Sequence, residues 1–262
     1  MNKPTDGPHW TVDRDDAVSV LRYHGDERRT LAIPEAAQFE SLVAERATLD
    51  EPPVLVIVVD VLHAELEEVR QMSDGRPIAD WAPWVGAISG LETYPSATIV
   101  AVEHQATCGG LELSLAADIR VAAPDARLGV LETRMGILPG AGGTQRLPEL
   151  IGFGNTSLLV LTGEPVSGRE AHRMGLVQLL DDDPVARAIA LAEHLATIGP
   201  TVLCATKGAI AAGRVRSDNG FRVEGRAFLA VVGTDDSKQR IDRWLDAQAE
   251  GHNPALDESS LP

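Results

Sequence analysis

The chain has 262 residues, of which 44% are hydrophobic, and its formal net charge is −16 at neutral pH. This length and apolar content are sufficient for one large α/β domain, or for such a domain with a small appendage. The acidic balance argues against nucleic acid as a partner, because a surface that follows phosphates needs clustered lysine and arginine. The chain has only three lysines, Lys3, Lys207 and Lys238.

Cysteine content and apolar runs give the expected compartment. Cys108 and Cys204 are the only cysteines and form no C-x-x-C pair, so we expect neither a disulfide framework nor a zinc ribbon. The first residues are polar and acidic, unlike a secretory signal, and no window approaches the ~20 apolar residues of a membrane span. These features predict a cytoplasmic protein with no membrane partner.

Strands and helices alternate through the first two thirds of the chain. Continuous apolar and β-branched runs predict strands at 18–23, 52–62 and 96–104. Helical patterns lie at 34–51 and 84–94, after residue 107, and from the glycine-rich loop at 139–146 onward. Beyond Asp183 the pattern is almost entirely helical. We therefore predict an α/β core in residues 1–195 and a helical region in residues 196–262.

Two glycine-rich stretches each place a glutamate near a predicted helix start. Gly109 and Gly110 begin an apolar helix, with Glu112 on the same face as Gly109. Backbone N–H groups at such a start bind a phosphate or a developing oxyanion. A glutamate that merely complements the helix dipole would also explain Glu112. Glu132 precedes the second stretch. Two carboxylates at one oxyanion site indicate an acid and a base, so the pair favours a catalytic role over the dipole explanation.

The run "HQATCGGLELSLAADIRVAAPDARLGVLETRMGILPGAGGTQRLPELIG" (104–152) resembles the enoyl-CoA hydratase/isomerase (crotonase) superfamily. Its distinctive parts are "GGLELSLAADIRVA" and "PGAGGTQRL", and the similarity continues at 161–177 and 234–239. The resemblance implies a crotonase-like α/β fold, the spiral of ββα units shared with ClpP, with a C-terminal helical trimerisation region. It also implies homotrimers or hexamers.

The resemblance assigns roles to individual residues. Glu112 and Glu132 correspond to the two catalytic carboxylates, and Gly140 to a glycine whose helix dipole polarises the attacking water. The N–H groups of Gly109 and Ala64 correspond to the oxyanion hole, although the segment around Ala64 departs from the family motif at His63 and Glu65. The resemblance also implies coenzyme A contacts and an acyl-pocket wall; the contacts are Arg22, Leu62, Lys207 and Lys238, and the wall is Trp81 and Trp84.

The implied activity is hydration or dehydration at the 2,3 bond of an acyl-CoA or acyl-carrier thioester. No metal or separate cofactor is expected, since coenzyme A is part of the substrate. Two alternatives remain. One is an isomerase or decarboxylase of a specialised biosynthetic pathway, although family isomerases typically keep only the carboxylate at the Glu132 position. The other is a non-catalytic acyl-CoA-binding subunit, favoured by the altered segment around Ala64.

Overall fold

The computed structural model describes residues 9–24, 30–61, 63–64, 66–73, 81–212, 225–226 and 228–250. Leu62, a predicted coenzyme A contact, lies outside the described residues. Of His63 and Ala64 the backbone is described.

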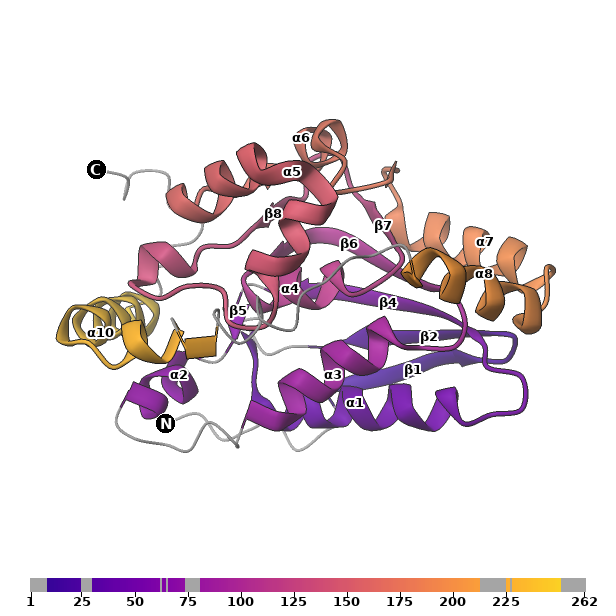
Figure 1. The fold of residues 1–262 in the computed structure, drawn as a ribbon, viewed down its shortest axis with the longest axis horizontal. Helices are drawn as coiled ribbons and strands as arrows, with labels where there is room; N and C mark the ends of the chain where they lie inside the picture. Colours follow the sequence, from indigo (N-terminus) through magenta and orange to yellow (C-terminus); the bar gives the residue numbers. More distant parts are fainter. Residues whose placement is uncertain are drawn as a thin grey trace.

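Eight of the described strands form one mixed sheet at the centre of the molecule (Figure 1). Its order is β1-β2-β4-β6-β7-β10, with β8 paired to β6 and β9 paired to β8. The strands are β1 (Trp10–Asp15), β2 (Val18–Tyr23), β4 (Val54–Val61), β6 (Thr98–Thr107), β7 (Ile119–Ala122), β8 (Arg127–Gly129), β9 (Val166–Ser167) and β10 (Leu179–Leu180). Strands β2, β4, β6 and β7 run parallel, so their carboxyl ends meet at one edge. The antiparallel edge strand β1 was not predicted.

Strand β4 is buried on both faces, as its continuous apolar run predicts. Leu55, Ile57 and Val59 face a core formed with α1 (Ile33–Ala47) and α3 (Ala82–Glu92). Val54, Val56 and Val58 face the other way, into a core formed with α7 (Pro184–Ala196). Successive side chains of a strand point to opposite faces, so one strand supports both helical layers.

The remaining helices surround the carboxyl edge of the sheet or extend from its far end. They are α2 (Leu66–Ser73), α4 (Gly109–Leu115), the 3-10 helix η2 (Glu132–Met135), α5 (Gly143–Thr162), α6 (Gly168–Met174), α8 (Pro200–Ala212) and α10 (Asp235–Ala249). Helix α5 is two helical segments joined by a kink at Gly152, whose φ is +73°.

A second core joins the C-terminal part of the chain to the sheet's carboxyl edge. Ile241 and Trp244 of α10 pack with Val69 of α2 and Met135 of η2. Figure 1 shows α10 beside α2 at one end of the molecule, with α7 and α8 at the other end. The predicted boundary near residue 195 falls at the end of α7, whose apolar side chains belong to the core of the sheet. In the described residues no single helix is long and apolar enough to cross a membrane; α7 and α8 pass that test only as a pair bent by 106°.

Candidate active site

The connection from β6 to α4 depends on two glycines that lie in close contact with their neighbours. A Cβ at Gly110 would lie 2.9 Å from the Val61 carbonyl oxygen, and one at Gly109 would lie 2.7 Å from the Trp84 ring. Glycine therefore lets α4 pack directly on β4 and on Trp84. Because the first N–H groups of a helix have no partner within it, Gly109 brings such a group to the wall of a cavity.

Glu112 is buried and holds the glycine-rich loop in place. Its side chain is in α4, and its Oε1 accepts hydrogen bonds from the N–H groups of Ala141 and Gly143, both at 2.8 Å. A Cβ at Gly143 would come within 3.0 Å of this oxygen, so glycine permits the close approach of the loop. The carboxylate thus connects the two glycine-rich stretches that the sequence singled out.

The loop before α5 is fixed from its other side by Arg146. This buried guanidinium donates to the Ala141 carbonyl at 3.0 Å and forms an ion pair with Glu92 at 3.0 Å. Helix α5 begins at Gly143, so Gly140 lies three residues before the helix start rather than at it. Gly140 lies on the cavity wall, and its predicted role in polarising water stays a prediction. The N–H groups of its neighbours Ala141 and Gly143 bind Glu112.

Glu132 is also buried and begins the 3-10 helix η2. The buried Cys108 side chain lies close enough to Glu132 to be affected by its charge. Burial, reinforced by the charge of Glu132, raises the pKa of the Cys108 thiol well above its usual value, so the group is neutral. Cys108 has φ +49° and ψ −125°, a conformation that favours glycine, and the sequence has cysteine where the family motif has glycine.

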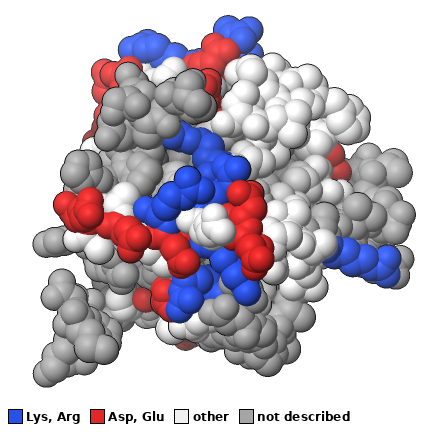
Figure 2. Space-filling view, turned by 90° about the vertical axis from the view of Figure 1, so that its left-hand side faces the viewer, with Lys and Arg blue, Asp and Glu red and all other residues white. Residues whose placement is uncertain are grey.

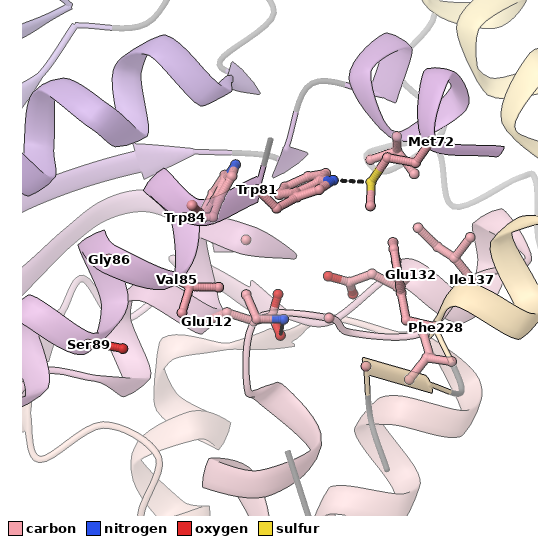
Figure 3. A pocket seen from close by; sticks show the side chains of 17 residues that line it. Met72, Trp81, Trp84, Val85, Gly86, Ser89, Glu112, Glu132, Ile137 and Phe228 are labelled. Carbon is pink, nitrogen blue, oxygen red and sulfur yellow. Dashed lines mark hydrogen bonds between the residues drawn. The ribbon is translucent and has the colours of Figure 1, made fainter. Parts of the chain in front are cut away.

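Both glutamates face one cavity of about 590 Å³. Figure 3 shows their carboxyl groups turned toward the same space, with Trp81 on the opposite wall. The cavity brings together six of the predicted site residues, Glu112, Glu132, Gly109, Gly140, Trp81 and Trp84. The other described lining residues are Val69, Met72, Ala82, Val85, Gly86, Ser89, Ile137, Leu138, Ala141, Gly225 and Phe228.

Four predicted residues are not part of this described lining. Ala64 lies in β5 (His63–Ala64), which pairs with β3 (Thr30–Leu31) and packs against α4. Arg22 forms ion pairs with Asp13 at 2.8 Å and Glu103 at 3.3 Å. Lys238 is on α10, close to the cavity's end of the molecule.

Lys207 is placed away from the cavity. It forms an ion pair with Asp118 at 2.8 Å and donates to the Ser96 carbonyl, just before β6 begins. Gly109 follows the other end of this ten-residue strand, which spans about 33 Å. Lys207 is therefore far from this cavity within one chain, and its predicted contact with coenzyme A stays a prediction.

Beyond Trp81 and Trp84, the sequence did not indicate the apolar walls of the cavity. Met72 comes from α2, Ile137 follows η2, and Phe228 comes from the C-terminal segment. These residues are far apart in the chain and carry no motif.

Residues 68–251 match the family model described as enoyl-CoA hydratase/isomerase. The chain belongs to the enoyl-CoA hydratase/isomerase family. The match covers most of the chain, and the crotonase fold with its mixed sheet and surrounding helices agrees with it. The family assignment thus confirms the resemblance that the glycine-rich motifs indicated.

Curated relatives carry hydratase names. Over 180 residues, 66% of this chain, it is 38% identical to the human enoyl-CoA hydratase domain-containing protein 2, mitochondrial. A probable enoyl-CoA hydratase of Bacillus subtilis is 37% identical over 60% of the chain, and the human methylglutaconyl-CoA hydratase is 34% identical over 66%. The match spans 62% of the length of each of the first two relatives and 53% of the third.

Solved structures show the same fold. An enoyl-CoA hydratase from Bacillus anthracis has a TM-score of 0.73 and 30% identity, with 94% of this chain and 98% of that chain covered. An enoyl-CoA hydratase/isomerase from Mycobacterium paratuberculosis has a TM-score of 0.83 at 18% identity, with 90% and 98% covered, a likeness of fold alone.

Proposed function

We propose that this protein is an enoyl-CoA hydratase, which adds water across the 2,3 double bond of an acyl thioester and also catalyses the reverse reaction. The observation that carries the proposal is the pair of buried carboxylates, Glu112 and Glu132, that face one apolar cavity beside the N–H of Gly109. A binding-only protein would gain nothing from burying two acidic groups there, because burial of charge is unfavourable.

In the proposed reaction, a water molecule lies between Glu112 and Glu132. The carboxylates remove its proton as its oxygen bonds to C3, and a proton is delivered to C2, so that one water is added. Negative charge develops on the thioester oxygen as an enolate, and the N–H of Gly109 together with that of Ala64 stabilises it. Positioned acid–base groups contribute about 10²- to 10⁴-fold, and one oxyanion donor about 10²- to 10³-fold.

Coenzyme A or a phosphopantetheine arm would carry the acyl group, and its phosphates need cations. Figure 2 shows lysine and arginine side chains gathered with acidic ones at the end of the molecule where α2 and α10 lie. Arg70 and Arg240 are each paired to an acidic neighbour on their own helix, and Lys238 is on α10. We propose this end, rather than Lys207, as the approach for the phosphates.

We also propose that the protein is a homotrimer, alone or paired into a hexamer. Several large apolar side chains are exposed on two helices, with Phe153 82% and Leu161 76% exposed on α5, and Ile210 63% exposed on α8. Exposed apolar groups in such number favour an interface. Sedimentation velocity at micromolar concentration should give a trimer or hexamer, and a monomer would contradict this proposal.

The hydratase proposal is tested by the loss of conjugated-thioester absorbance with crotonyl-CoA and longer 2-enoyl-CoAs. Glu112→Gln and Glu132→Gln should each lower kcat at least about 100-fold, because each removes a proton-transferring group but keeps its shape. Hydration that survives in either variant at the parent rate would contradict the two-carboxylate mechanism. Activity that depends on Glu132 but not on Glu112 would instead favour an isomerase.

A further inference from the structure

The wall of the cavity has an unusual balance of charge. Among the described lining residues, the only ionisable side chains are Glu112 and Glu132, both at the place where the reaction would occur. None of the described lining residues is lysine, arginine or histidine. Apart from Ser89 and the glycines, all the others are apolar.

Aromatic and thioether groups form much of this wall. The rings of Trp81 and Trp84 lie 6.0 Å apart at an interplanar angle of 39°, and the Trp81 indole N–H contacts the Met72 sulfur. Phe228, from the C-terminal segment, lies on the same wall as Met72 and Ile137 (Figure 3). Flat rings and a flexible thioether fit apolar groups closely and offer few hydrogen bonds.

The cavity is larger than a crotonyl group needs. At about 30 Å³ for a group the size of water, 590 Å³ has room for about twenty non-hydrogen atoms, which include the thioester and the attacking water. A short acyl group would leave much of the apolar wall in contact with water. Each further methylene that fills such a site is worth about tenfold or more in kcat/KM.

We propose that the acyl group of the substrate is long or aromatic and uncharged at its far end. This inference rests on the proposed hydratase function and specifies its substrate class. An acyl group that ends in a carboxylate would bury a third negative charge against an apolar wall, near Glu112 and Glu132. Burying an unpaired charge is strongly unfavourable, so the site selects against such acyl groups.

The proposal separates this protein from some of its relatives. The human methylglutaconyl-CoA hydratase is 34% identical to this chain, and the acyl group in its name ends in a free carboxylate. Shared catalytic glutamates are compatible with different acyl groups, because the acyl group contacts the cavity walls rather than the motifs.

The experiment compares kcat/KM of the full chain for crotonyl-CoA, 2-octenoyl-CoA and 2-octenedioyl-CoA. The last two have the same length and differ in whether the chain ends in a methyl group or a carboxylate. We expect kcat/KM for octenoyl-CoA to be at least about tenfold higher than for crotonyl-CoA and at least about 100-fold higher than for octenedioyl-CoA. The proposal would be overturned if kcat/KM for octenedioyl-CoA were within about tenfold of the value for octenoyl-CoA. It would also be overturned if crotonyl-CoA and octenoyl-CoA gave equal values. Hydration of none of the three would instead refute the hydratase function itself.

A pair of variants tests the wall directly. Trp81→Ala should lower kcat/KM for octenoyl-CoA at least about tenfold more than for crotonyl-CoA, because the longer chain loses the indole surface. Trp81→Phe keeps an aromatic ring and should retain most of the preference. An equal loss on both substrates in Trp81→Ala would contradict the role of this wall in selecting the acyl group.

Discussion

The two hydrogen bonds to Glu112 allow its structural role to be separated from its proposed catalytic role. Its Oε1 accepts from Ala141 and Gly143, and a hydrogen bond to a charged group contributes about 1.5–3 kcal/mol. Glu112→Ala removes the acceptor of both bonds and leaves one buried and one partly buried N–H group, so the free energy of unfolding should fall by about 3–6 kcal/mol. Glu112→Gln keeps a neutral oxygen in the same place, and neutral hydrogen bonds are about half as strong. This variant should therefore lose only about half as much stability.

The assay is urea unfolding followed by circular dichroism, with each free energy taken by linear extrapolation. All variants are measured at one protein concentration, because association would otherwise change the apparent stability. Both variants should lose hydratase activity, whereas their stabilities should differ by at least about 1.5 kcal/mol. Equal stability of the alanine and glutamine variants, or an alanine variant as stable as the parent, would refute the view that Glu112 holds the loop.

Three further predictions concern the surroundings of the site. Gly110→Ala should lower the free energy of unfolding by about 1–3 kcal/mol, measured in urea, because the added Cβ would lie 2.8 Å from the Val61 Cβ. Arg120→Leu should lower the free energy of unfolding by about 3–5 kcal/mol in the same assay, because this buried guanidinium donates to three carbonyls, two of them at the end of α4. Arg120→Lys keeps the charge but lacks the planar guanidinium, so it should recover only part of this loss. At pH 8, iodoacetamide should alkylate the exposed Cys204 and spare Cys108, because the raised pKa keeps that buried thiol protonated; mass spectrometry showing Cys108 labelled in the folded protein would contradict this.

The motif-bearing part of the site and two residues of its wall, Trp81 and Trp84, could be predicted from the sequence, and the rest of the wall could not. Glu112 and Glu132 lie beside glycines whose local purpose, close approach and exposed N–H groups, is visible in sequence. The same motifs gave the family correctly. Met72 and Phe228 reach the cavity only because α2 and the C-terminal segment fold onto each other, and no local pattern records that contact.

One difference between prediction and structure has a clear physical cause. Strand β1 was missed because its side chains are mostly polar and exposed, as expected for an antiparallel edge strand with one solvated face.

The most direct test of the central claim is the fate of solvent atoms in the product. A 2-enoyl-CoA should be incubated with the protein in water enriched in oxygen-18 and deuterium, and the product analysed by mass spectrometry and NMR. Hydration predicts one oxygen-18 at C3 and one deuterium at C2, both lost in Glu112→Gln and Glu132→Gln. A product that gains deuterium without oxygen-18, or a thioester that binds and stays unchanged, would contradict the account.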